Sequence, residues 1–361
     1  MKKKLFDILK FFFFLGIGSA ILYFVYQKQD AAYQEECALK GVAVEDCSLI
    51  GKVITDITSA DYFWLSLVFA VFVISNISRA IRWTMLLRPM GYAPKLANAF
   101  WCTMIGYLTN LGVPRAGEFI KSAMLSKYEN IPVEKVMGTV VTDRIVDVIS
   151  LAFVMGLALL VEYDTIYNMV TGLMGGEEAV ADNGGTSILV WLGGLGILGI
   201  ILLVIFFQRL SETRIFKKIV DVAKGFFEGI QTVRNLEKPG WFAFHSANIW
   251  FMYFAMTYLC FFAFAPTANL PAIAGLIVFV FGGWGIVVPS PGGMGTYHFM
   301  VVTSLALYGV SGDDAFSFAN ISFFSINLGC NVLLGVIGLI LLPIYNKNYK
   351  PARVDNQVNN T

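Results

Sequence analysis

Long apolar runs separated by short polar segments dominate the hydrophobic pattern of this chain. The first run follows three lysines and continues to about Tyr26, past a small-residue patch that is typical of a signal-peptide cleavage site. Because apolar residues continue beyond that patch, we interpret the run as an uncleaved helix. Five later runs have about the length of a bilayer-spanning helix: 62–87, 134–161, 187–207, 241–264 and 316–343. The pattern predicts an all-α polytopic membrane protein with about six full transmembrane helices.

Proline and glycine interrupt two further apolar stretches, 96–126 and 271–310. Both residue types disrupt helical hydrogen bonding, and backbone that leaves a helix inside a membrane must be buried in protein or line a cavity. The charges of the flanking loops place the two ends of each stretch on the same side of the membrane. We therefore predict two hairpins, built either from two short helices or as re-entrant loops, which bring the number of membrane segments to about eight. The breaks are formed by Pro114, Gly117, Pro289, Pro291, Gly292, Gly293 and Gly295.

Composition supports the membrane assignment. Hydrophobic residues make up 57% of the 361-residue chain and charged residues 14%, and the mean hydropathy is +0.68. This leaves too little charge for a soluble chain of this length. By the positive-inside rule, the basic segments lie in the cytoplasm. They are the N-terminal lysines, 79–95, 208–240 and the polar tail 346–361, whereas the acidic loops 27–61 and 162–186 are expected outside. Both termini are therefore predicted to be cytoplasmic.

The order of the segments is the same in two parts of the chain, 5–161 and 187–343: helix, helix, broken hairpin, helix. The first part starts inside and the second outside, which is the pattern of an inverted-topology repeat. Coincidence is the alternative, because any helix hairpin needs turn residues. We predict one transmembrane domain over 1–345. Its cytoplasmic segment 208–240 has apolar residues at helical spacing and is either an amphipathic helix on the inner leaflet or a partner-binding helix.

Polar side chains lie in or beside the first break. Asn110, Arg115 and Glu118 occupy a segment that is expected to be embedded in the membrane. Arg115 directly follows the proline, and its guanidinium group can hold a phosphate through two parallel hydrogen bonds. Free N–H groups at the start of the following half-helix would support that interaction. The alternative is an Arg115–Glu118 ion pair that only stabilises the hairpin.

Three ionisable residues lie well inside the third predicted span. Asp143 and Asp147 are four positions apart and share a helical face, and Arg144 is three positions from Asp147. Charges at this depth are costly and face partners or a water-filled cavity. The group is therefore either an internal ion pair that locks helices together or part of a substrate site. On the preceding span we expect Arg79 to pair with an aspartate and Arg82 to reach the cytoplasmic surface.

The cations near the breaks outnumber the carboxylates by two. The cations are Arg79, Arg82, Arg115, Lys121 and Arg144, and the carboxylates are Glu118, Asp143 and Asp147. A cavity formed by all of them would suit an anionic headgroup. Membrane lipids are the expected partners, whereas protein partners are not predicted.

Motifs for other chemistry are missing from the sequence. No zinc-protease, nucleotide-binding or hydrolase motif occurs, so we expect no catalytic residue, cofactor or nucleic-acid partner. Cys37 and Cys47 share the outer loop and form either a disulfide or two free thiols. Cys102, Cys260 and Cys330 lie in apolar segments and are interpreted as packing residues. No spacing predicts a metal site.

Four motifs occur in order along the chain. They are Asn76-x-x-Arg79-x-x-Arg82-Trp83, GYLTNLGVPRAGEF at 106–119, Asp143-Arg144-x-x-Asp147, and PSPGGMGTYHF at 289–299. Together they resemble the transmembrane region of the lysylphosphatidylglycerol synthase/flippase family, over about residues 5–345. The resemblance implies a multi-pass protein of the bacterial inner membrane whose flippase-like domain moves a lipid. Nothing in the chain resembles the soluble synthase domain of that family, so we expect no aminoacyl-transferase activity.

The resemblance also assigns residues. Arg115 and Glu118 match a Pro-x-Arg-x-Gly-Glu motif of the family, and Arg144 and Asp147 match a motif whose first position is expected to be Glu but is Asp143 here. In many members an acidic residue follows the second break, where this chain has Tyr297-His298. This difference leaves the substrate open. Ser290 and His298 complete the predicted substrate-binding set, and His298 would make the site pH-dependent if it titrates near neutrality.

These observations favour a flippase or scramblase-like transporter for an anionic phospholipid or a lipid-linked headgroup, with alternating access between the two hairpins. One alternative is an intramembrane enzyme that modifies a lipid and uses Glu118, an aspartate or His298 as its acid or base. Another is a non-transporting accessory subunit of an envelope-assembly complex.

Overall fold

The computed structural model describes residues 2–39, 47–113, 116–163, 236–287, 293–349 and 351, and all regular elements within these ranges are helical. Several predictions concern residues outside them: the span 187–207, nearly all of the acidic loop 162–186, most of the segment 208–240, and the break residues Pro114, Arg115, Pro289, Ser290, Pro291 and Gly292.

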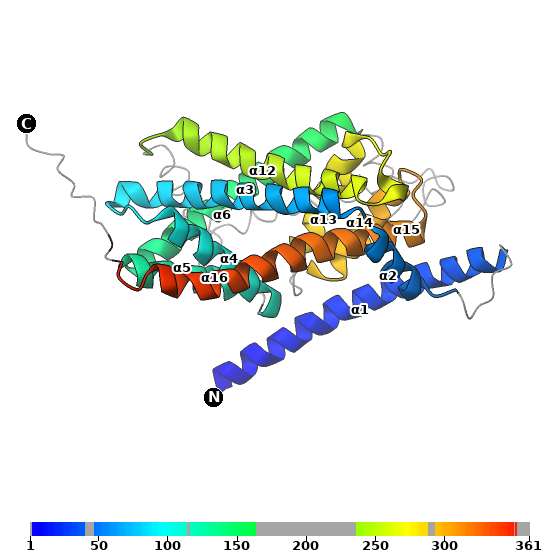
Figure 1. Ribbon diagram of the computed structural model, residues 1–361, viewed down its shortest axis with the longest axis horizontal. Helices are drawn as coiled ribbons and strands as arrows, with labels where there is room; N and C mark the ends of the chain where they lie inside the picture. Colours follow the sequence, from blue (N-terminus) through cyan, green and yellow to red (C-terminus); the bar gives the residue numbers. More distant parts are fainter. Residues whose placement is uncertain are drawn as a thin grey trace, which may run out of the picture.

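Long helices run along the long axis of the molecule (Figure 1). Within the described ranges, three are long and apolar enough to cross a membrane: Tyr62–Met90, Val133–Val161 and Gly312–Tyr345. They confirm the spans predicted at 62–87, 134–161 and 316–343. The first contains α3 (Tyr62–Leu87), the second is α6 (Val133–Val161), and the third consists of α15 (Gly312–Ser322), the π-helical η5 (Phe323–Cys330) and α16 (Asn331–Tyr345). Two other long helices, α1 (Lys2–Leu39) and α12 (Pro239–Phe262), cover the predicted runs at the N-terminus and at 241–264.

Both broken stretches form pairs of short helices. The first pair is α4 (Leu96–Gly112) and α5 (Ala116–Glu129), and the second is α13 (Ala272–Val287) and α14 (Thr296–Ala306). The two hairpins lie toward opposite ends of the long axis (Figure 1).

Glycines let the two helices of each hairpin approach closely. A Cβ atom on Gly117 would collide with the carbonyl oxygen of Gly106, and one on Gly285 would lie 2.7 Å from the carbonyl oxygen of Thr296. No side chain fits at such distances, so these positions require glycine.

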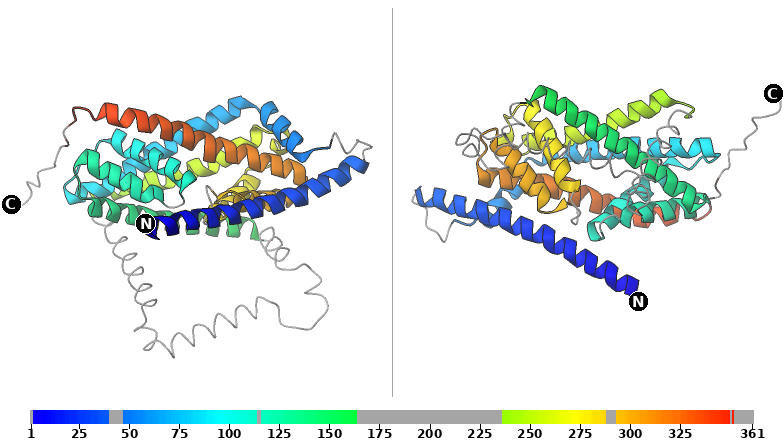
Figure 2. Two further views of the ribbon diagram at one scale, coloured as in Figure 1. Left: turned by 90° about the horizontal axis from the view of Figure 1, so that it is seen from below. Right: turned by 180° about the vertical axis from the view of Figure 1, so that it is seen from behind.

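The helix α12 packs along α3, α16 packs against α4, and α14 packs against α15. The backbone N–H of Asp61 donates to the carbonyl oxygen of Ala263 at 2.9 Å, which joins the start of α3 to the end of α12. The helix α1 contacts α14 and α15, while its N-terminal part stands away from the other helices (Figures 1 and 2).

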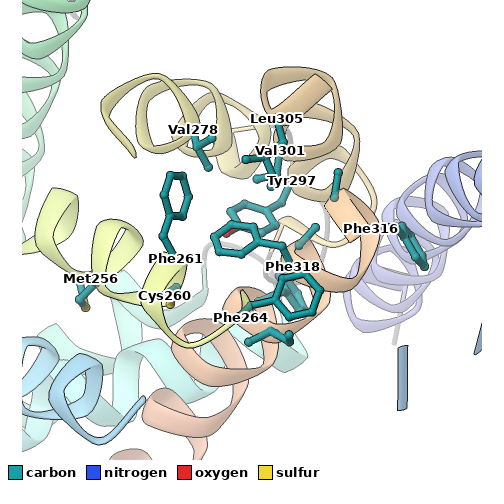
Figure 3. Packing of buried hydrophobic residues seen from close by; sticks show 14 of the residues in the cluster. Met256, Cys260, Phe261, Phe264, Val278, Tyr297, Val301, Leu305, Phe316 and Phe318 are labelled. Carbon is teal, nitrogen blue, oxygen red and sulfur yellow. The ribbon is translucent and has the colours of Figure 1, made fainter. Parts of the chain in front are cut away.

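A large apolar cluster holds the second hairpin against α12 and α15 (Figure 3). The rings of Phe261 and Phe318 have centroids 5.0 Å apart in an edge-to-face arrangement, and the hydroxyl groups of Tyr297 and Ser322 lie 2.8 Å apart. In a bilayer, apolar surface gains little by leaving lipid, so close packing and interhelical hydrogen bonds of this kind hold the helices together.

The segment 27–61, predicted as an outer loop, is largely helical. The helix α1 continues through it to Leu39 because its polar residues retain helix-forming character after the apolar run ends. A disulfide joins Cys37 to Cys47, which decides between the two alternatives for these cysteines. A second helix, α2 (Leu49–Ser59), is amphipathic and buries Leu49 and Val53.

An ion-pair group attaches α2 to the start of α15. Lys52 Nζ lies 2.8 Å from Asp56 Oδ2, 2.6 Å from Asp314 Oδ1 and 3.5 Å from Asp313 Oδ2. Burial lowers the pKa of Lys52, but the hydrogen bonds to Asp314 and Asp56 and the charges of these carboxylates outweigh this effect. The net result is a Lys52 pKa above its usual value.

Candidate functional site

A buried ion-pair network joins α3 to α6. Arg79 Nη1 lies 3.0 Å from Asp143 Oδ2 and 2.8 Å from Asp147 Oδ2, and Arg82 Nη2 lies 2.6 Å from Oδ1 of each aspartate. The network forms because the arginines are three positions apart on one helical face and the aspartates are four positions apart on the facing one. The expected partnership of Arg79 with the aspartates is confirmed.

Arg82 corrects a prediction. It was expected to reach the cytoplasmic surface, but it is fully buried, with a relative exposure of 0%. Its Nε donates to Asp143 Oδ1 at 2.8 Å and its Nη2 donates to Asp147 Oδ1 at 2.6 Å. Two carboxylates on α6 accept hydrogen bonds from the guanidinium inside the bundle. They take the place of water, so the side chain does not extend to the cytoplasmic surface.

The helix α12 supplies two further hydrogen-bond acceptors to the arginines. Tyr253 Oη accepts from Arg79 Nη2 at 3.0 Å, and Ser246 Oγ accepts from Arg82 Nη1 at 3.3 Å. A buried charge pair is tolerated only when further hydrogen bonds satisfy its remaining donors. Neither residue could be selected from the sequence, because no pattern links α12 to the arginines across more than 150 positions.

The network opens toward the first hairpin through Arg144. Its Nη2 lies 2.8 Å from Glu118 Oε1 on α5, and its Nη1 lies 3.5 Å from Asp147 Oδ2. The Arg144 side chain is 41% exposed and that of Glu118 27% exposed, whereas the aspartates are nearly covered. Among the described residues, Glu118 therefore pairs with Arg144. Arg115 is not among the described residues, so the predicted Arg115–Glu118 pair stays a prediction.

Lys121, on α5, is a buried cation. Its relative exposure is 3%, and its Nζ lies 5.1 Å from the centre of the Trp83 ring. The ring is held in place by a hydrogen bond from Trp83 Nε1 to Thr139 Oγ1 at 3.0 Å. No carboxylate oxygen within the described ranges lies within 4.0 Å of the Lys121 ammonium group. The three arginines of the network face three carboxylates, so Lys121 is the surplus positive charge of this group.

The sequence indicated Lys121 only as one of the cations near the breaks, and Trp83 only as part of a motif. The spacing of Lys121 could have shown that it belongs to the site, because it lies three positions after Glu118 and on the same side of α5.

Asn110 stabilises the backbone of the first hairpin. Its Oδ1 accepts from the backbone N–H of Gly117 at 2.7 Å, at the start of α5. The predicted break residue Gly117 thus lies between Asn110 and the Gly106 carbonyl. This contact places Asn110 in a positioning role.

His298 lies in the aromatic core of the second hairpin. Its relative exposure is 1%, and its ring centroid lies 4.9 Å from that of Phe323 and 6.1 Å from that of Phe316. It was expected to line a substrate path, but its neighbours are these two rings and the side chain of Asn320, with which it forms a hydrogen bond. Nearby, Gly293 and Gly295 have φ of 80° and 85°, values that favour glycine, as expected for a break.

No group of three or more His, Cys, Asp or Glu side chains within the described ranges could hold a metal ion. What the network can do is fix the positions of α3, α6 and α12 relative to one another, and present one partly exposed guanidinium and one buried ammonium beside the first hairpin.

Comparison with known proteins gives a family match. The family model described as lysylphosphatidylglycerol synthase TM region matches residues 48–343, which include the whole network. Glycosyltransferase AglD of Haloferax volcanii is 26% identical over 280 residues, which cover 71% of this chain and 45% of that protein. UPF0104 membrane protein MJ1595 of Methanocaldococcus jannaschii is 26% identical over 101 residues, 27% of this chain and 30% of that protein. The chain thus spans less than half the length of these curated relatives, and no solved structure matches it.

Proposed function

Because the chain belongs to the family of the lysylphosphatidylglycerol synthase transmembrane region, we propose that it is a multi-pass lipid transporter of the bacterial inner membrane. Its cargo is an anionic phospholipid or a lipid-linked anionic headgroup, which it moves between leaflets as a flippase or scramblase. The observation that carries this proposal is the surplus cation Lys121, buried beside a broken membrane hairpin and next to the open edge of the arginine–aspartate network.

The headgroup site is built from the first hairpin. A buried ammonium without a carboxylate is costly unless a ligand supplies the counter-charge. A phosphate would do so at Lys121, and the partly exposed Arg144 offers it a planar pair of donors. Arg115 directly precedes α5 in the sequence and adds a further positive charge.

The Arg79–Arg82–Asp143–Asp147 core of the network acts as a support for this site rather than as its binding surface. All four side chains are at most 9% exposed, and every arginine–aspartate pair among them is joined by a hydrogen bond. Asp147 orients Arg144, and Arg144 in turn holds Glu118 on α5. This chain of contacts couples the position of the first hairpin to α3 and α6.

We also infer an inverted repeat, in which α3 to α6 correspond to α12 to α16. In each half a long helix is followed by a hairpin and a second long helical run, and each hairpin crosses at a glycine. In transporters of this plan, access alternates between the two sides as one part rocks against the other.

Cytoplasmic termini are part of the proposal. The disulfide between Cys37 and Cys47 supports an outer location for the end of α1, because disulfides persist in oxidising compartments. The opposite end of the bundle carries Lys95, whose Nζ lies 3.7 Å from the Tyr349 ring centre just after α16, and basic residues favour the inner side.

One observation favours a second function. A relative at 26% identity is named as a glycosyltransferase. The second candidate function is therefore that of an intramembrane enzyme that modifies a lipid. Against an enzyme, Asp143 and Asp147 are held in ion pairs with arginines and are not free to act as acid or base. Glu118 is the more exposed carboxylate of this group, but it is paired with Arg144.

The test is lipid movement by the purified protein in liposomes, read by surface quenching of fluorescent lipids. Wild-type protein is expected to accelerate movement of an anionic lipid, Lys121→Gln and Arg115→Ala to abolish most of it, and Lys127→Gln, an exposed position on the same helix, to leave it unchanged. Equal rates for Lys121→Gln, Arg115→Ala and wild type refute the site. Conversion of the lipid to a new product without movement supports the enzyme.

A further inference from the structure

An apolar groove lies between α1 and α14, beside the second hairpin. It has a volume of about 450 Å³ and is lined by Ala20, Ile21 and Phe24 of α1 and by Thr296, Phe299 and Met300 of α14. This volume lies within the range of small-molecule pockets. The network described above has no part in it.

The walls of the groove offer no free polar group. Its one polar side chain, Thr296, donates its hydroxyl hydrogen toward the carbonyl oxygens of Gly285 and Gly293, within its own hairpin. A headgroup, a sugar or a peptide backbone would therefore lose its hydrogen bonds on entering the groove. A hydrocarbon chain would lose nothing.

The groove begins at the second break and is open to the side. Thr296 is the first residue of α14, immediately after the positive-φ residue Gly295. Phe24 is 65% exposed, and α1 diverges from the bundle toward its N-terminus (Figures 1 and 2). A molecule in the groove would thus have its end beside the break and its length accessible from the bilayer.

We propose that this groove binds a hydrocarbon chain of a membrane lipid. The proposal rests on the proposed function, since it assigns the tail of the transported lipid to α1 and α14 while the headgroup uses the site at the first hairpin. The rings of Phe24 and Phe299 give the groove large apolar walls, and the flexible side chain of Met300 can follow a chain of variable shape. Helix pairing in membranes instead uses small residues on both surfaces, whereas most of the α14 wall consists of the large side chains of Phe299 and Met300.

The experiment uses the full chain in liposomes that contain a lipid with a photoactivatable diazirine near the end of its acyl chain. After irradiation, adducts are mapped by mass spectrometry. We expect adducts at Phe299 and Met300 to exceed those at Phe153 and Phe251, which are 72% and 61% exposed and report ordinary contact with bulk lipid.

Variants sharpen the result. Ala20→Trp fills the groove and is expected to remove the adducts on α14, whereas Ser19→Trp, on the neighbouring exposed position of α1 outside the groove lining, should retain them. If Ala20→Trp fails to fold, the distribution in the wild-type protein is sufficient by itself.

Two outcomes overturn the proposal. One is equal labelling of the groove and the bulk-lipid positions. The other is protection of the groove, as expected if a helix of a second copy packs on Gly16 and Ala20. Lipid movement is measured in the same samples. Concentrated labelling in a protein that moves no lipid leaves the groove standing and refutes the transport function.

Discussion

Removal of a single member of the buried network is expected to destabilise the protein more than removal of an oppositely charged pair. Arg82 contacts both aspartates, and Asp143 accepts from both arginines. Asp143→Leu therefore leaves two guanidinium groups facing Asp147 alone. Arg82→Met leaves both aspartates with Arg79 as their main partner, since Arg144 lies 3.5 Å from Asp147.

The magnitude follows from burial. Arg82 and Asp143 are 0% and 1% exposed, and removing one partner of a buried pair costs about 3–5 kcal/mol. The double variant, Arg82→Met with Asp143→Leu, keeps the Arg79–Asp147 pair at 2.8 Å and leaves no charge without a counterpart. Replacement of a buried pair by apolar side chains is often neutral. The double variant should therefore be more stable than either single variant.

The assay is thermal unfolding of the detergent-solubilised protein, followed by tryptophan fluorescence and by recovery of the monodisperse species. Each single variant should lower the midpoint, on the order of 10 °C for a loss of this size. Arg88→Met, at an exposed position just after α3, is the matched control and should leave the midpoint unchanged. Losses in the two single variants that simply add in the double variant would show that the charges do not stabilise one another.

Three further predictions concern other parts of the molecule. Gly117→Ala should separate α4 from α5 and lower thermal stability by about 1–3 kcal/mol or more, whereas Gly112→Ala, with nothing within 4 Å of the added Cβ, should not; equal stability of the two variants contradicts the close crossing. Cys47→Ser should free Cys37 for a membrane-impermeant maleimide added from outside the cell; labelling only from the cytoplasmic side reverses the proposed topology. Lys52 has a raised pKa, so its stabilising contribution is complete below its unfolded pKa of about 10.4 and is lost as pH rises through the folded value. Lys52→Met should cost about 1 kcal/mol at pH 7 in denaturant unfolding, and a cost that persists at strongly alkaline pH refutes the ion-pair account.

The parts of the site that could be predicted from sequence are those set by local spacing. Asp143 and Asp147 share a face because they lie four positions apart on a helix, and the glycines at the two breaks indicated where the helices are interrupted. The depth of Arg82 was mispredicted because it depends on which side chains of α6 lie opposite, and a sequence of one chain does not align two helices in space. The aromatic burial of His298 has the same cause: its neighbours Phe316 and Phe323 belong to another helix.

The hydrogen bonds between the two halves of the molecule restrict how a transporter of this shape could move. Arg79 bonds to Tyr253, Arg82 to Ser246, and Asn248 Nδ2 donates to Ser78 Oγ at 2.7 Å, so that α3 of the first half is fastened to α12 of the second. Parting these helices would leave buried donors without acceptors, at about 1–3 kcal/mol for each group and more for the charged ones. Rocking of one whole half against the other would require that separation. The motion with the smallest cost keeps α3, α6 and α12 together as a scaffold and moves the hairpins against it, since Glu118 holds the first hairpin through a partly exposed ion pair that solvent can replace.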